Sequence, residues 1–145
     1  NGTFFYGSNF SIGVNLFFEV NKKLAQLMAA RNEYSAEMLE VHHTQKLDAP
    51  SGTAISLAEG IIKNLPQKNS WVNNKIPKES ELNIKSERLG EVPGIHTVKY
   101  ESEVDFLEIT HSAKSRKGFA FGAVLAAEYC QKNTGILSMK NLLNI

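Results

Sequence analysis

Between residues 12 and 28 the apolar side chains recur every three or four positions, and this feature constrains the fold more than any other. They form one stripe: Ile12, Leu16, Phe17, Val20, Leu24, Leu27 and Met28. The opposite side carries charged and amide side chains, so one face suits water and the other needs a partner surface. We predict a helix that runs to about residue 30, packs on a sheet and is capped by Asn9 or Ser11.

The rest of the chain supplies the sheet and further helices. Alternating or apolar runs predict strands at residues 3–6, 34–43, 82–89, 95–101 and 104–111, with a shorter one near Trp71. Apolar periodicity predicts helices at about 52–64 and 117–131, and a short one after Ser138. This order predicts an α+β fold with a mixed β-sheet of about four strands and helices packed on one face.

Composition excludes several classes of protein. The 145 residues carry 16 Lys and Arg against 15 Asp and Glu, which gives no general attraction to nucleic acid or to an anionic membrane. No apolar run approaches the roughly 18 residues of a membrane-spanning helix. The single cysteine, Cys130, suits a reducing compartment. We therefore expect a cytoplasmic domain with no nucleic-acid or membrane partner and, because the chain opens with Asn1, a piece of a longer protein.

Residues 40–54 combine three features that carry chemistry. A predicted strand ends in His42 and His43, whose imidazoles ordinarily titrate near neutral pH. Lys46 follows in a loop and can supply a cation or a proton. Residues 51–53, Ser-Gly-Thr, open a helix whose free N–H groups and dipole attract an anion, and the glycine allows close approach to the backbone. Together these features predict a pocket for a small carboxylate or phosphate beside a proton donor.

Each feature also has a purely structural explanation. The histidines could lie on the surface, Lys46 could be a solvated charge, and Ser51 could serve only as a helix cap. Adjacent His42 and His43 point to opposite faces of a strand, and no suitably spaced further ligand follows, so we predict no metal site. Four further residues keep open roles, with salt bridges or structural contacts as alternatives to ligand binding: Arg88, His96, His111 and Arg116.

At this point the residues form a pattern that resembles a known family. Glu40-Val41-His42-His43, Lys46 and Asp48-Ala49-Pro50-Ser51-Gly52-Thr53-Ala54 resemble the signature of the dihydrodipicolinate (4-hydroxy-tetrahydrodipicolinate) reductases of lysine and diaminopimelate biosynthesis. Residues 7–15 resemble the family segment that follows the nucleotide-binding domain, and later blocks of the family are matched by residues 88–90, 93–94, 96, 111, 115–116 and 119–123. The resemblance covers essentially all 145 residues.

The resemblance implies a reaction and a set of site residues. NADPH or NADH would deliver hydride to a conjugated cyclic imine that carries two carboxylates, giving tetrahydrodipicolinate. By motif position His42 is the acid or base, and Lys46 is a second proton donor or a cation at the reacting ring. The substrate-binding positions are then His43, Ser51, Gly52 and Thr53, and the cofactor-binding positions are Gly7, Ser8, Asn9 and Phe10.

The resemblance also implies how the chain is divided. The family has an N-terminal Rossmann domain with a G-x-G-x-x-G turn, and this sequence contains no such turn. We expect residues 1–10 to be a hinge, 11–115 a substrate-binding and oligomerisation domain, and 116–145 a C-terminal helical segment that returns towards the nucleotide-binding domain in the family.

Three expectations concern the isolated chain. It should be inactive by itself, and it should form a homo-oligomer, a tetramer, through the open sheet. The apolar helix at 117–131 should be sheltered by self-association or tucked against this domain. The alternative to an enzyme domain is a non-catalytic module that binds a dicarboxylate or serves assembly.

Overall fold

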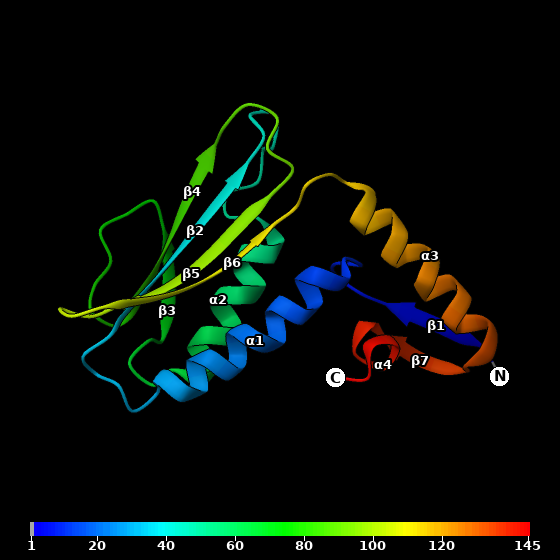
Figure 1. Ribbon diagram of the computed structural model, residues 1–145, viewed down its shortest axis with the longest axis horizontal. Coiled ribbons are helices and arrows are strands. Elements are labelled where there is room, and N and C mark those ends of the chain that lie inside the picture. Colours follow the sequence, from blue (N-terminus) through cyan, green and yellow to red (C-terminus); the bar gives the residue numbers. More distant parts are fainter. Residues whose placement is uncertain (1) are drawn as a thin grey trace.

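The molecule consists of two groups of elements that lie side by side in Figure 1. The computed structural model describes residues 2–145, so Asn1, the first residue of the expected hinge, lies outside the described residues. The larger group contains α1 (Ile12–Met28), β2 (Ser35–His42), α2 (Gly52–Asn64), β3 (Ser70–Asn73), β4 (Glu81–Arg88), β5 (Ile95–Glu101) and β6 (Phe106–Ser112). The smaller group contains β1 (Thr3–Tyr6), α3 (Lys117–Lys132), β7 (Gly135–Ser138) and α4 (Met139–Leu143).

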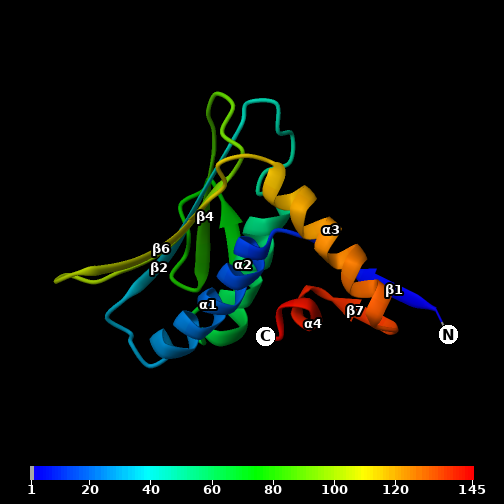
Figure 2. The ribbon, with the colours of Figure 1, turned by 45° about the vertical axis from the view of Figure 1, so that its right-hand side comes forward.

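The larger group is built on one mixed sheet with the strand order β3-β4-β2-β5-β6. β2 is parallel to β4 and antiparallel to β5, while β3 is parallel to β4 and β6 is antiparallel to β5. α1 and α2 lie together on one side of this sheet (Figure 2). The predicted α+β fold is confirmed. The sheet has five strands rather than about four, because the short β3 extends its edge beside β4.

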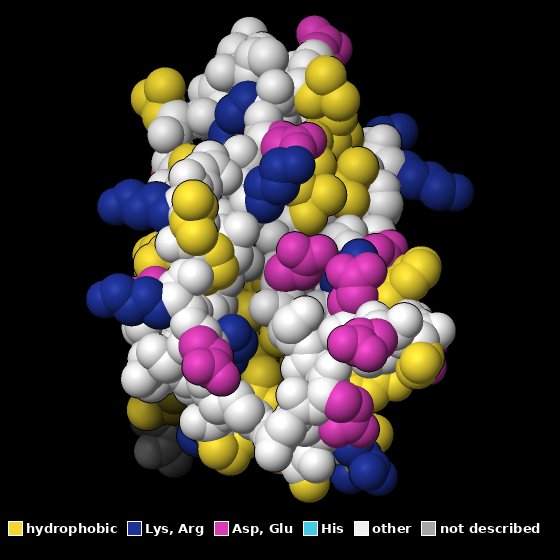
Figure 3. Space-filling model, turned by 90° about the vertical axis from the view of Figure 1, so that its left-hand side faces the viewer, with side chains coloured by type: hydrophobic (Ala, Val, Ile, Leu, Met, Phe, Trp, Pro, Cys, Tyr) yellow, Lys and Arg dark blue, Asp and Glu magenta, His cyan; other side chains and the backbone are white. Residues whose placement is uncertain are grey.

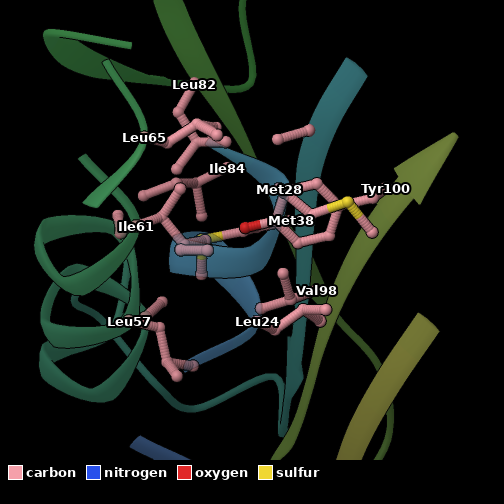
Figure 4. Close-up of a cluster of buried hydrophobic side chains, with 14 of the residues drawn as sticks. Leu24, Met28, Met38, Leu57, Ile61, Leu65, Leu82, Ile84, Val98 and Tyr100 are labelled. Carbon is pink, nitrogen blue, oxygen red and sulfur yellow. The ribbon is translucent and has the colours of Figure 1, made fainter. Parts of the chain in front are cut away.

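The hydrophobic core fills the space between the two helices and the sheet. Figure 4 shows side chains from α1, β2, α2, β4 and β5 converging there. Leu57, Ile61, Leu82, Ile84, Val98 and Tyr100 are fully buried. Each of the five aliphatic side chains contributes about 1.5–3 kcal/mol relative to its exposed state.

The predicted stripe of α1 is wider than the face that the core covers. Phe17, Leu24 and Met28 are buried, but Leu16, Val20 and Leu27 are about half exposed or more. Periodicity in the sequence identifies the helix and its general orientation. It does not reveal how wide a partner surface the sheet and α2 offer.

The smaller group joins the two ends of the chain. β1 and β7 form a parallel pair in which Thr3 lies opposite Gly135 and Tyr6 opposite Ser138. The sequence predicts β1 but not β7, because a four-residue segment with only two apolar residues has no readable periodicity. β7 forms where the fold brings residues 135–138 beside β1.

α3 contacts its neighbours through a narrow face. Only Gly122 and Ala126 of this helix are buried, whereas Phe121 and Val124 are more than half exposed. At Gly122 the helix touches the carbonyl oxygen of Phe10 so closely that any side chain would collide with it. We expected this helix to be sheltered either by self-association or by packing against this domain. In the single chain the second alternative is not seen, because most of the apolar surface of α3 stays exposed.

Two observations concern the surface. No helix among residues 2–145 is long and apolar enough to cross a membrane. Figure 3 shows the side of the molecule that lies at the left of Figure 1, where Lys and Arg side chains are separated by acidic and hydrophobic ones.

Candidate functional site

The residues singled out by sequence meet at one cavity of about 340 Å³. It lies where β2 ends and α2 begins, and both predicted catalytic residues and all predicted substrate-binding residues line it. Of the predicted cofactor residues, Ser8 and Asn9 line it and Gly7 and Phe10 do not. The full lining is Ser8, Asn9, Phe18, His42, His43, Lys46, Ser51, Gly52, Thr53, Pro93, Arg116 and Phe119.

The beginning of α2 provides hydrogen-bond donors at this cavity. Ser51 is the N-cap, and its Oγ accepts a hydrogen bond from the Ala54 amide at 3.2 Å. The first two helical amides, those of Gly52 and Thr53, have no acceptor among residues 2–145. Gly52 is exposed, and nothing lies within 4 Å of where its Cβ would be. An anion can therefore reach the positive end of the helix dipole.

Two cationic side chains, Lys46 and Arg116, line the same cavity. Lys46 Nζ is 2.8 Å from Oδ1 of Asp48, and this hydrogen bond lowers the pKa of the Asp48 carboxyl. Arg116 Nη2 is 3.1 Å from Nε2 of His43. Since the guanidinium only donates, the histidine nitrogen accepts. Sequence reasoning left the role of Arg116 open, and the fold brings this residue to the cavity from the loop before α3.

The segment before α1 forms another part of the cavity wall. Asn9 Nδ2 donates to Thr53 Oγ1 at 3.2 Å, which ties a predicted cofactor residue to a predicted substrate residue. Phe10 instead stacks on Phe5, with ring centroids 5.7 Å apart. Gly7 lies against Met139 and Phe10. The structure therefore places only part of the expected cofactor segment at the cavity.

Behind the cavity lies a buried charged group, Glu40, that sequence reasoning did not assign. Its Oε1 accepts from the Ser51 amide at 3.2 Å and from Arg88 Nη2 at 3.1 Å, and its Oε2 lies 2.8 Å from His42 Nδ1. Burial raises the pKa of Glu40, but the contacts with His42, Ser51 and Arg88 outweigh it and hold that pKa far below its usual value. Glu40 is therefore a carboxylate at neutral pH.

Strand register assembles this group. In the parallel pair of β2 and β4, His42 lies opposite Arg88, and in the antiparallel pair of β2 and β5, Glu40 lies opposite His96. The sequence held one indication that Glu40 belongs to the site. Alternation along β2 puts Glu40 and His42 on the same face as Met38, and that face is buried. A charged residue on a buried face needs a partner.

His96 completes the buried group. Its Nε2 is 3.1 Å from Ser51 Oγ, and its ring meets that of His42 edge-on with centroids 5.0 Å apart. Possible ligand atoms of Glu40, His42 and His96 lie within 4.8 Å of one another, a set that the sequence did not suggest. The guanidinium of Arg88 is already paired with Oε1 of Glu40, and its positive charge opposes the binding of a metal ion among these three side chains.

We predict that His96 makes the stability of the chain sensitive to acid. Burial, followed by the charge of nearby His42, lowers the pKa of His96 to about 4 from its ordinary 6.5. Between these pH values the unfolded chain binds a proton that the folded chain does not, so stability falls as the pH drops from 6.5 towards 4. Urea unfolding at pH 7.5, 6 and 5 measures this loss.

The matching variant is His96→Gln, which keeps a polar partner for Ser51. It should show a weaker fall in stability over the same pH range. His111, whose pKa burial also lowers, remains in the variant and contributes in the same direction. An unchanged pH dependence in His96→Gln would contradict the assignment.

The arrangement can bind a small anion and move a proton. Free amides and the Arg116 guanidinium suit carboxylate oxygens, and the His42 imidazole and Lys46 ammonium lie at the same cavity as proton donors.

Comparisons with known proteins bear on this site. A family model described as dihydrodipicolinate reductase, C-terminus, matches residues 13–143. The 4-hydroxy-tetrahydrodipicolinate reductase of Christiangramia forsetii is 51% identical over 144 residues, which are 99% of this chain and 60% of the relative. That of Methanosarcina acetivorans is 39% identical over 140 residues, 94% of this chain and 52% of the relative.

A solved structure agrees with these relatives. Dipicolinate-bound dihydrodipicolinate reductase from Paenisporosarcina sp. TG-14 has 26% sequence identity and a TM-score of 0.66, over 92% of this chain and 52% of that protein. The chain spans between about half and 60% of the length of these relatives. It belongs to the dihydrodipicolinate reductase family and corresponds to the C-terminal part of those enzymes.

Proposed function

We propose that this chain is the substrate-binding part of an enzyme that uses NADPH or NADH to reduce a dihydrodipicolinate-type cyclic imine to tetrahydrodipicolinate in lysine and diaminopimelate biosynthesis. The observation that supports this proposal most is that one cavity is lined both by Gly52 and Thr53, whose amides have no acceptor among residues 2–145, and by the side chains of His42 and Lys46. The dipicolinate in the related structure is an aromatic ring with two carboxylates, and it supports the same class of ligand here.

Each wall of the cavity has a part in this proposal. The amides of Gly52 and Thr53, with His43 and Arg116, bind the substrate carboxylates. Ser51 supports the site from behind, because its hydroxyl is engaged by the Ala54 amide and His96 and its own amide donates to Glu40. His42 and Lys46, which line the cavity, supply the substrate ring with the proton that must follow the hydride.

The hydride comes from NADPH or NADH when one of them is bound. In this chain the predicted cofactor residues reach the cavity only at its edge, where Asn9 donates a hydrogen bond to Thr53. We propose that Ser8 and Asn9 contact its nicotinamide end and that Gly7 and Phe10 shape the segment that carries them. The remaining contacts belong to a nucleotide-binding domain, so we propose that residues 2–145 alone do not turn over.

The open face of the sheet supports a further part of the proposal. It carries alternating side chains of β2, β5 and β6 that no helix among residues 2–145 covers, among them Leu39, Thr97 and Lys99. We propose that this face mediates homo-oligomerisation, with a tetramer as the assembly.

The substrate class is tested with pyridine-2,6-dicarboxylate as the probe. We expect it to raise the melting temperature of this chain, and Gly52→Pro to bind about 10- to 100-fold more weakly, because proline removes one amide that donates to a charged acceptor. Proline is tolerated at the first position of a helix, and the extended Ser51 backbone, with ψ 155°, suits the residue before it.

Gly52→Ala is the matched control, since it adds carbon at the same place but keeps the amide. It should bind more tightly than Gly52→Pro. Equal binding by both variants would place the carboxylate elsewhere. If the probe binds but a full-length protein carrying this chain oxidises neither NADPH nor NADH with the cyclic imine, the chain is the non-catalytic dicarboxylate-binding module.

A further inference from the structure

The two oxygens of Glu40 face partners of different kinds. Oε1 accepts from two groups that can only donate, the Ser51 amide and the Arg88 guanidinium. Oε2 lies 2.8 Å from one ring nitrogen of His42, Nδ1, off the direction of an ideal N–H bond, and neither atom has another hydrogen-bond partner among the described residues. Glu40 is 0% exposed, so no solvent contact competes with these three partners.

The ionised carboxylate determines which nitrogen of His42 carries the proton. A carboxylate is negatively charged and only accepts, so a hydrogen on Nδ1, 2.8 Å from Oε2, is favoured over a free electron pair at that position. In the neutral ring the other nitrogen, Nε2, then holds the free electron pair. Nε2 lies on the side of Gly94, where a Cβ would be only 3.1 Å from it, next to Pro93 in the cavity lining.

We propose that Glu40 is a positioning residue that keeps a proton on Nδ1 of His42 in both the neutral and the protonated ring, so that Nε2 is the ring atom that takes up a proton from solvent and passes it to the bound substrate. The step at substrate rests on the proposed function, whereas the placement of the proton on the ring does not. Glu40 itself does not line the cavity, so it acts through His42.

The other histidine of the group does not compete for this role. His96 Nε2 is 3.9 Å from Glu40 Oε2 but 3.1 Å from Ser51 Oγ. Because Ser51 Oγ already accepts from the Ala54 amide, its own hydrogen is available to His96. His96 thus has its own partner, and Oε2 is left to His42.

Arg88 holds the carboxylate in this orientation. Its guanidinium also donates to the carbonyl oxygens of Lys46 at 3.3 Å and Asp48 at 2.6 Å. One side chain therefore anchors Glu40 and the backbone of the loop that carries Lys46. Arg88 therefore supports both groups proposed to donate protons, His42 through Glu40 and Lys46 through its backbone.

The amide variant Glu40→Gln tests the proposal sharply. An amide has one oxygen and one NH₂ group. The oxygen must face Ser51 and Arg88, since NH₂ there would oppose two donors, so NH₂ faces His42 Nδ1. That nitrogen must then accept, and the proton of the neutral ring moves to Nε2. The substitution should invert the tautomer of His42.

The readout is the imidazole ¹⁵N spectrum of this chain at a pH where His42 is neutral, assigned by comparison with His42→Asn. We expect Nδ1–H in the unsubstituted chain and Nε2–H in Glu40→Gln. Glu59→Gln, the same change at an exposed site on α2, should leave the spectrum unchanged. Nε2–H in the unsubstituted chain overturns the proposal, even if Glu40→Gln does not fold, and so does an unchanged tautomer in folded Glu40→Gln.

Turnover supplies a second readout in a full-length reductase that carries this chain. Where a buried carboxylate orients a catalytic histidine, its amide selects the wrong tautomer and lowers kcat by about 10⁴-fold. We expect Glu40→Gln to lower kcat by about 10²- to 10⁴-fold with little change in KM. A loss confined to KM would contradict a positioning role. If even the unsubstituted protein lacks turnover, the proposed function fails, and the ¹⁵N result still decides the position of the ring proton.

Discussion

Replacing His42 by Asn, or Lys46 by Ala, in a full-length reductase that carries this chain is expected to lower kcat by about 10²- to 10⁴-fold. The physical reason is that the hydride leaves an electron pair on the substrate, which must be protonated by a group within reach. The two side chains line the cavity from opposite ends of one short segment, a strand end and a loop. The assay follows NADPH oxidation with the cyclic imine as substrate.

The controls separate chemistry from a general effect of substitution. Lys63→Ala removes an exposed lysine near the end of α2 and should leave kcat unchanged. The double variant at His42 and Lys46 should lose less than the product of the single losses if the two groups serve one proton transfer. Turnover near the unsubstituted value in either single variant would show that the residue concerned is not catalytic.

The second large effect concerns stability. We expect Arg88→Met to lower the free energy of unfolding by about 3–5 kcal/mol, because it leaves the carboxylate of Glu40 buried without its cation. It also removes the hydrogen bonds that hold the backbone of Lys46 and Asp48. Urea unfolding at neutral pH measures the change.

Two comparisons locate the cause of this loss. Arg31→Met, at an exposed position in the turn after α1, should cost much less. In Glu40→Gln/Arg88→Met the buried charge is gone, so the double variant should be more stable than the sum of the single losses predicts. If Arg88→Met costs no more than Arg31→Met, the buried pair does not stabilise the fold.

Much of the fold could be predicted because its signals are local. The caps lie next to the helices they start: Ser51 caps α2, and of the two candidates for α1 it is Ser11 that forms the cap. Strand alternation in β2, β4, β5 and β6 is likewise readable within seven or eight residues. β7 could not be predicted, since its existence depends on β1, more than 120 residues away.

The site divides in the same way. The cluster of His42, His43, Lys46 and residues 51–53 could be found because it occupies one short segment, and its members do meet at one cavity. Phe18, Phe119 and Arg116 reach the same cavity from helices or loops far away in the sequence, and no local pattern marks them as a set.

The sequence by itself determined the helices, the principal strands and the short segment that ends in the exposed start of α2, because periodicity and capping act between residues a few positions apart. Only the tertiary structure decided what surrounds His42. Glu40 meets Arg88 and His96 through the registers of β2 with β4 and β5. A shift of one residue would turn these side chains to the other face of the sheet. Register is set by how the whole core packs, and this is why the buried charge and its partners cannot be read from any one segment.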